Sequence, residues 1–299
     1  MEDTEHNPFC TEVTPEWHPP YRPDYDAWQA ARREYLGASD TAAALGRSKW
    51  KSPYTLWLEK MGHRQPDPTK EVMHWGNLHE PLIIEEVARL SDTEVLALQV
   101  SRTHHHSPYL RCHLDAYVRD GYIEAKQVTA YQEPDWDQDD PPLEYHIQIA
   151  HTFACCPDLS FCLLGALFGG NRLRIWKIDR DDELVRQVER GAEEWWEQYV
   201  LTGQEPPVTG HDDCRQALQE QHPPKDELPE LDLTAHASVL ATREQSDELA
   251  KQYTEAKKTA DNELRRLMGA HTVARINGRK ITYRENKNGV RSLRVGRRP

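Results

Sequence analysis

Residues 110–128, LRCHLDAYVRDGYIEAKQV, decide the fold class of this chain of 299 residues. Apolar and polar residues alternate on both sides of Asp120-Gly121, a dipeptide that favours a tight turn between strands. Alternation of this kind is typical of strands that bury one face. The stretch therefore predicts two antiparallel strands that form a hairpin.

The predicted hairpin brings acidic side chains together. Alternate side chains of a strand share a face, so His113 and Asp115 point the same way on the first strand. Glu124 and Lys126 share a face of the second strand. Paired carboxylates suit Mg²⁺ or Mn²⁺, which can polarise a phosphoryl group and generate hydroxide from water. Lys126 could then position that nucleophile or neutralise charge on the phosphate. The alternative interpretation is a surface pair of strands with a Glu124–Lys126 ion pair.

Periodicity predicts further elements on both sides of the hairpin. Strands are expected over 94–102, 159–168 and 171–180. Helices are expected over 26–36, 39–46, 52–62, 71–91, 143–156 and 182–200. Ser39 or Asp40 is the expected N-cap of the second helix. In the fourth helix, one face is expected to carry Leu78, Ile83, Val87 and Leu90. This order of elements makes an α/β or α+β architecture.

Composition divides the chain into segments of different character. We expect a flexible arm over 1–23, a main domain over 24–201, a linker rich in proline and acidic residues over 202–235, and a helix with a basic β segment over 236–299. The net charge of -13 hides an asymmetry. Residues 264–299 carry 11 Lys and Arg against one acidic residue. We therefore expect this end to contact phosphate or a protein partner.

The sequence also argues against two kinds of membrane targeting. The mean hydropathy is -0.85, and no run of about 18 apolar residues is present, which excludes a membrane span. The first residues are acidic and lack the apolar core of a secretory signal, so a cytoplasmic location with reduced thiols is expected. Cys155, Cys156 and Cys162 are expected to be core thiols, and His104–His106 to be solvated.

A series of motifs runs in order along the chain. It comprises Trp28, Arg32, LGASD at 36–40, SPYTLW at 52–57, WGNLHEP at 75–81, the Glu-x-Lys at 124–126 and Tyr145-x-x-Gln148. This series resembles the YqaJ-like viral recombinase family, within the PD-(D/E)xK nuclease superfamily, whose best-known relative is lambda exonuclease. The resemblance covers residues 24–200. It implies a central mixed sheet flanked by helices, with a helical and basic C-terminal extension here, and a phage or prophage origin.

The resemblance also implies roles for individual residues. Glu80, Asp115, Glu124 and the carbonyl of Ala125 match the ligands of a metal site for Mg²⁺, with two ions and with Mn²⁺ as a substitute. Lys126 and Gln148 complete the catalytic group, and Tyr145 lines it. Arg32 and Ser39 match a pair that holds the 5′-phosphate of a DNA end; for Arg32, simple exposure to solvent is the alternative. The family usually reads Ser-Pro-Asp-Gly where this chain has His113-Leu114-Asp115-Ala116. His113 therefore either contacts phosphate or is a passive strand residue.

Two functions follow from the resemblance. The first is a Mg²⁺-dependent exonuclease that digests linear duplex DNA from 5′ to 3′ and leaves 3′ overhangs for a single-strand annealing protein, assembled as a homotrimer. The second is a module that binds DNA ends or supports assembly, or an endonuclease, with the same fold but no processive digestion. The three acids Glu80, Asp115 and Glu124 favour the enzyme, since clustered carboxylates repel one another and DNA unless a metal offsets them.

Overall fold

The computed structural model describes residues 30–65, 71–136, 140–225 and 227–296. Its contacts divide the chain into two compact units, one ending at Pro223 and the other beginning at Pro224. Each unit is described by itself. The arm expected over 1–23 and most of the helix expected over 26–36 lie outside the described residues, apart from a short helical turn that includes η1, Arg32–Glu34.

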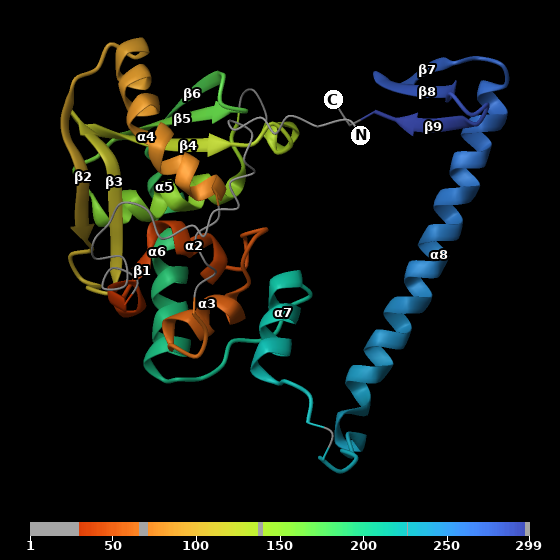
Figure 1. Cartoon of the computed structure of the whole chain (residues 1–299), viewed down its shortest axis with the longest axis horizontal. Coiled ribbons are helices and arrows are strands. Elements are labelled where there is room, and N and C mark those ends of the chain that lie inside the picture. Colours follow the sequence, from red (N-terminus) through yellow and green to blue (C-terminus); the bar gives the residue numbers. More distant parts are fainter. Residues whose placement is uncertain (1–29, 66–70, 137–139, 226, 297–299) are drawn as a thin grey trace, which may run out of the picture. The chain divides into compact units, whose positions relative to one another are not determined.

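A six-stranded mixed sheet forms the centre of the first unit (Figure 1). Its order is β1-β3-β4-β5-β6, and β2 also pairs with β3. The pairs β1–β3 and β4–β5 are parallel, and the others are antiparallel. The strands are β1 (Leu36–Gly37), β2 (Val95–Thr103), β3 (Leu110–Val118), β4 (Gly121–Val128), β5 (Phe161–Phe168) and β6 (Arg172–Asp179). The α/β fold with a central mixed sheet is therefore confirmed, and β3 and β4 form the predicted hairpin.

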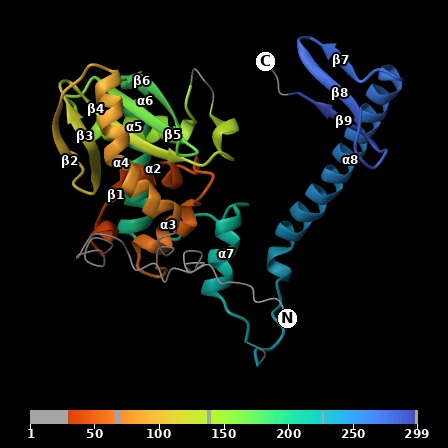
Figure 2. The ribbon, with the colours of Figure 1, turned by 45° about the horizontal axis from the view of Figure 1, so that its top comes forward.

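Helices cover both faces of the sheet (Figures 1 and 2). On one face lies α4 (Glu71–Leu90), which packs Ile83, Ile84 and Val87 against β3, β4 and β5. On the other face lies α5, which contacts β3 and is itself covered by α2 and α6. This second layer contains α2 (Ala38–Ala44), α3 (Pro53–Lys60), α5 (Leu143–Cys155) and α6 (Asp182–Trp195), and α6 continues as the π-helix η3 (Trp196–Leu201). The short η2 (Glu133–Asp135) precedes α5.

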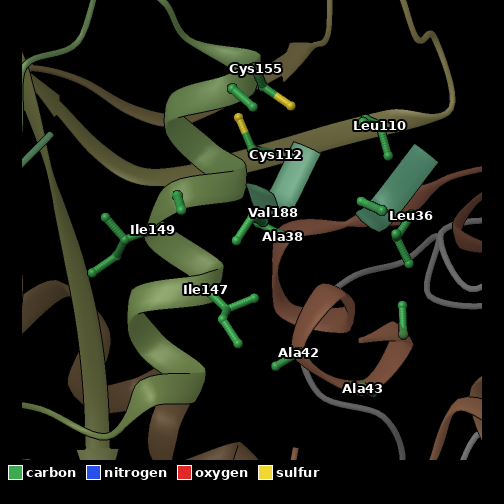
Figure 3. Close-up of a cluster of buried hydrophobic side chains, with 14 of the residues drawn as sticks. Leu36, Ala38, Ala42, Ala43, Leu110, Cys112, Ile147, Ile149, Cys155 and Val188 are labelled. Atoms are coloured by element: carbon green, nitrogen blue, oxygen red, sulfur yellow. The ribbon is translucent and has the colours of Figure 1, made fainter. Parts of the chain in front are cut away.

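The larger hydrophobic core lies between α5 and the elements around it. Figure 3 shows Ala42 and Ala43 of α2 near Ile147 of α5, and Cys112 of β3 near Cys155. Cys155, Cys156 and Cys162 are all buried, as expected for core thiols. Because α2 and α5 pack against each other here, the core fixes the position of Ser39 relative to Gln148.

Four local expectations differ from the structure. Helix α2 begins at Ala38 after Gly37, so Ser39 and Asp40 lie in its first turn and do not cap it. Leu78 and Leu90 are exposed at 47% and 55%, because only the stripe through Ile83 and Val87 meets the sheet. His104 is buried, because its turn packs against α6. Finally, α7 (Asp212–Gln221) forms within the stretch expected to be a linker, and its Asp213 accepts a hydrogen bond from the backbone N–H of Ser52 at 2.9 Å.

The second unit consists of one long helix and a small sheet. After the turn η4 (Thr234–His236), α8 (Ala237–Met268) runs over the helix predicted from the sequence. An antiparallel sheet follows, with strand order β7-β8-β9. Its strands are β7 (Val273–Ile276), β8 (Arg279–Glu285) and β9 (Arg291–Val295). Among the described helices of both units, none combines the length and apolar character that crossing a membrane requires.

Candidate functional site

The candidate site opens where β3 and β4 stop pairing. The antiparallel register ends at Ala116 opposite Ile123, so Asp115 and Glu124 are the next residues along the two strands. The backbone N–H of Ala125 donates to the Asp115 Oδ2 at 2.8 Å. The Asp115 carboxylate thus accepts the hydrogen bond that a backbone carbonyl of β3 would accept if the pairing continued. The N–H and C=O of one residue in an antiparallel ladder face the same neighbour, so the carbonyl of Ala125 also faces Asp115.

Glu124 is the most buried acid of the site, at 3% exposed. Its Oε1 accepts a hydrogen bond from Gln148 of α5 at 2.6 Å and pairs with the Lys126 Nζ at 2.7 Å. Its Oε2 is buried, and no partner for it exists among the described residues. A buried carboxylate oxygen without a partner is costly. The structure therefore presents one unsatisfied acceptor at the point where the sequence predicts a metal ligand.

The charges around Asp115 show the same imbalance. Burial raises the pKa of Asp115 well above its usual value, and the negative charges of Glu124 and Glu80 raise it further, whereas Lys126 opposes them. Burial lowers the pKa of Lys126, but Glu124 and Asp115 outweigh burial and keep its ammonium charged. Three carboxylates against one ammonium leave an excess of negative charge that a divalent cation can offset. Carboxylate and carbonyl oxygens, as on Glu80, Asp115, Glu124 and Ala125, are the donors that such a cation prefers, although the three carboxylates do not form a group with ligand atoms all within 4.8 Å of one another.

A hydrogen-bonded relay that the sequence did not reveal holds Glu80. The Gln99 Nε2 donates to the Glu80 Oε1 at 2.6 Å, and the Gln99 Oε1 lies 2.7 Å from the His113 Nε2. His113 in turn lies 2.9 Å from the Ser101 hydroxyl through Nδ1. Gln99 of β2 lies opposite Asp115 of β3, because its neighbours Leu98 and Val100 pair with the two residues on either side of Asp115. Its φ of 55° is a strained conformation for a non-glycine residue in a strand, and such strain clusters at functional sites. Residue type and alternation gave no signal for this backbone.

Arg32 and Ser39 lie together, although they come from different elements. The Arg32 Nη2 lies 3.3 Å from the Ser39 Oγ and 2.8 Å from the Asp40 Oδ1. Lys60 of α3 binds the other oxygen of Asp40 at 2.8 Å. Burial raises the pKa of Asp40, but Arg32 and Lys60 outweigh burial and hold that pKa well below its usual value. The Arg32 side chain is 26% exposed and anchored, so it does not simply extend into solvent.

A hollow of about 220 Å³ lies beside this pair, and Ser39 lines it, whereas Arg32 and the three acids do not. Ser39 and Asp40 line it from α2, and Tyr145 and Gln148 line it from α5. Gln148 also binds Glu124, so one side chain borders both the hollow and the acids. Burial raises the pKa of Tyr145 to about 12, which keeps its phenol neutral. The structure therefore places the two predicted groups of site residues next to each other.

A second cluster of possible ligands does not fit a metal. His104, Glu189 and Glu193 offer ligand atoms that lie within 4.8 Å of one another. The His104 Nδ1 accepts a hydrogen bond from the backbone N–H of Ser107 at 3.1 Å, so Nε2 carries the proton and faces the Glu189 Oε1 at 3.2 Å. A metal at Nε2 would move that proton to Nδ1, where the Ser107 N–H already lies. Ser107 also donates through its hydroxyl to Glu193. The cluster therefore ties the turn before β3 to α6.

Comparison with known proteins shows what this part of the chain is similar to. Residues 27–157 match the YqaJ-like viral recombinase domain, the family that the motifs indicated. The protein YqaJ of Bacillus subtilis (strain 168) is 28% identical over 250 residues, which cover 80% of this chain and 78% of YqaJ. Protein D345L of African swine fever virus (strain Badajoz 1971 Vero-adapted) is 31% identical over 97 residues, which cover 30% of this chain and 28% of D345L.

A solved structure shares the fold. The alkaline exonuclease LHK-Exo of Laribacter hongkongensis superimposes with a TM-score of 0.51 at 18% identity, over 65% of this chain and 97% of that protein. Its complex with dAMP gives a TM-score of 0.50 at 19% identity, over 66% of this chain and 97% of that chain. At these identities the likeness shows a shared fold.

Proposed function

We propose that this protein is a metal-dependent exonuclease that digests one strand of linear duplex DNA from its 5′ end. The observation that carries the proposal is the buried Glu124 Oε2, which lacks a partner among the described residues and lies in a cluster with Asp115 and Glu80. Three carboxylates repel one another and a nearby phosphate, so the cluster can act on phosphate only when a bound cation offsets their negative charge. The 3′ overhang left by such digestion would be the substrate of a strand-annealing protein in homologous recombination.

The residues of the chain divide the work between them. Glu80, Asp115, Glu124 and the Ala125 carbonyl would hold Mg²⁺ or Mn²⁺, with room for two ions implied by the family resemblance. The bound metal would polarise the scissile phosphoryl group and lower the pKa of a water molecule. The ammonium of Lys126 neutralises charge that develops on the phosphate. Gln148 orients Glu124 through the hydrogen bond to its Oε1.

The hollow would receive the terminal 5′-phosphate. Ser39 lines the hollow and offers a hydroxyl, and the guanidinium of Arg32, held by Asp40 at 2.8 Å, lies 3.3 Å from that hydroxyl, so both suit phosphate oxygens bound at this edge. Tyr145, a neutral phenol, can donate a further hydrogen bond. A terminal phosphate anchored there would hold the strand so that the next phosphodiester lies over the acids, and such positioning supplies a large share of a rate enhancement.

One experiment tests the metal site. Linear duplexes labelled at either 5′ end are incubated with and without Mg²⁺ for wild type, Glu80→Gln, Glu124→Gln and a matched control, Glu85→Gln, an exposed acid on the same helix as Glu80. We expect Mg²⁺-dependent loss of the 5′ label for wild type and the control, and at least a hundredfold slower loss for the two site variants. DNA binding without cleavage by wild type would instead favour an end-binding module, and internal cuts would favour an endonuclease.

A second experiment tests the phosphate pocket. Initial rates are compared on duplexes with 5′-phosphate and 5′-hydroxyl ends for wild type, Arg32→Ala and Arg33→Ala. Arg33 is the matched control, because it adjoins Arg32 but binds Gln65 at 2.9 Å. We expect wild type and Arg33→Ala to prefer the phosphorylated end at least tenfold, and Arg32→Ala to lose most of that preference. Equal wild-type rates on both ends would remove the pocket and leave the metal site in place.

The family resemblance also leads us to propose a homotrimer and an annealing partner. Light scattering on the purified full chain measures the first. Co-purification with an annealing protein encoded by the same phage or prophage tests the second. A monomer at micromolar concentration would contradict the trimer.

A further inference from the structure

The small sheet of the second unit has two faces of opposite character. Residues directly opposite one another in a sheet share a face. Ile281, Tyr283, Leu293 and Val295 lie on one face with Ala274, and Ile281 and the nearby Met268 of α8 are buried. This face carries the core of the unit.

The other face is basic. It carries Val273 and Arg275 from β7, Lys280, Thr282 and Arg284 from β8, and Ser292 and Arg294 from β9. All four cations are exposed, and this face includes no acidic side chain. Within the described part of the chain, no carboxylate forms an ion pair with any of the four. Arg275 donates to the Gly278 carbonyl at 3.3 Å. On the apolar face, Arg279 donates to the carbonyl of Gly296, and Arg291 donates to the carbonyls of Gly269, His271 and Tyr283.

The pairing of the strands makes this face costly unless an anion covers it. Arg275 lies directly opposite Lys280, and like charges in that position destabilise a sheet. Arg294 lies opposite Thr282, between Lys280 and Arg284 along the neighbouring strand. Four cations therefore converge on three adjacent strands. A partner with regularly spaced negative charges would relieve their repulsion.

We propose that this basic face, defined by Arg275, Lys280, Arg284 and Arg294, binds the sugar-phosphate backbone of the DNA substrate. Lys280 and Arg284 are four residues apart, about 13 Å along an extended strand. Each DNA strand carries one phosphate per 3.4 Å of helix axis, so cations spread over this length can meet more than one phosphate. Thr282 and Ser292 add hydroxyl groups, which commonly bind phosphate oxygens.

The chemistry of the face favours DNA over other anionic partners. Binding in a membrane interface needs an apolar surface that inserts among the lipids, and this face offers only the side chain of Val273. A protein partner would be expected to meet an aromatic or apolar centre, and one valine among four cations does not form one. The structure of the face by itself favours a partner with many negative charges. The identity of that partner as DNA rests on the proposed function. The inference adds a contact outside the YqaJ-like domain.

The test is the salt dependence of binding by the full chain. Fluorescence anisotropy of a labelled 30-base-pair duplex is measured in EDTA, which prevents cleavage, at 50 to 300 mM NaCl. The triple variant Lys280→Gln/Arg284→Gln/Arg294→Gln is compared with Lys251→Gln/Lys257→Gln/Lys258→Gln, which removes the same charge from exposed positions of α8. Each phosphate contact contributes about 0.9 to the slope of log K against log salt. We expect the face variant to lower that slope by about 2 to 3 and the helix variant by less than 1.

Other outcomes would overturn the proposal. A face variant with the wild-type slope would show that the face meets no phosphate, and equal losses in both variants would reduce the effect to net charge. Equally tight binding of wild type to poly-glutamate or to anionic lipid vesicles would reject DNA as the specific occupant. Circular dichroism checks that both variants keep the helix content of wild type. Cleavage by wild type in Mg²⁺ is measured separately, so that a failed nuclease proposal is distinguished from a failed binding face.

Discussion

His151 gives the sharpest quantitative prediction, because it is buried in the core between α2 and β3. Its Nδ1 lies 2.8 Å from the Thr41 hydroxyl of α2, and its Nε2 lies 3.1 Å from the Arg111 carbonyl of β3. Nε2 must donate to that carbonyl, so the neutral ring accepts from Thr41 through Nδ1. One imidazole on α5 therefore joins the helix that carries Ser39 to the strand that carries Asp115.

The structure fixes both the sign and the size of the effect of pH. Burial lowers the pKa of His151 from 6.5 to about 4, although the Arg111 carbonyl and Asp40 oppose this. Between these two values the unfolded chain holds a proton that the folded protein excludes. The stability is therefore fully present above pH 6.5 and falls as the pH drops toward 4. From these two pKa values, His151 alone removes about 2 kcal/mol between pH 7 and pH 5.

The measurement is urea unfolding at pH 7, 6 and 5, followed by tryptophan fluorescence. All nine tryptophans lie at or before position 196, so the signal reports the first unit alone. His151→Gln keeps an amide donor and acceptor but cannot titrate. We expect it to lose about 1 kcal/mol at pH 7 through poorer hydrogen bonds. It should then lose about 2 kcal/mol less than wild type between pH 7 and pH 5.

His105→Gln is the control, because His105 is exposed, and this variant should follow the wild-type curve. If wild type and His151→Gln lose the same free energy of unfolding between pH 7 and pH 5, the burial argument for His151 is wrong.

Three further predictions concern the site and its support. Asp115→Asn should raise the free energy of unfolding in EDTA, measured by urea titration, by at least about 1 kcal/mol, because it removes a buried charge among acids. The variant should also lose the stabilisation that wild type gains from Mg²⁺, about 2.7 kcal/mol at 100 times Kd. A variant that is less stable than wild type in EDTA would contradict this reasoning. Gln99→Ala should raise the Mg²⁺ concentration for half-maximal cleavage by about tenfold, with a smaller change in kcat at saturating metal, because Gln99 acts through Glu80. An unchanged Mg²⁺ requirement would show that the hydrogen bond from Gln99 to Glu80 does not support metal binding. Gly165→Ala would place a Cβ 2.4 Å from the Val87 Cγ2 and should lower the free energy of unfolding, measured by thermal or urea unfolding, by about 1 to 3 kcal/mol. A variant as stable as wild type would show that α4 can shift without loss of stability.

Local pattern determined the hairpin and its acids. A period of two places Asp115, Glu124 and Lys126 on defined faces, and the Asp-Gly signal predicts that the two strands pair. The loop itself is Arg119-Asp120, with Gly121 opposite Val118, so the structure decided the register. The same reasoning located α3, which Ser52 caps in the structure, and α8, because capping and periodicity act within a few residues.

The tertiary structure decided what depends on contacts between distant segments. Whether Leu78 of α4 is buried depends on which stripe meets the sheet, and α7 forms where Asp213 can bind Ser52. The Gln99 relay requires a strained backbone opposite Asp115, and the role of His151 requires partners on two other elements. Motifs could name Glu80, Arg32 and Ser39 by resemblance, but only packing shows that a single hollow joins Ser39 to Gln148. Periodicity records which side of an element is apolar, whereas a site is assembled by contacts that no local pattern encodes.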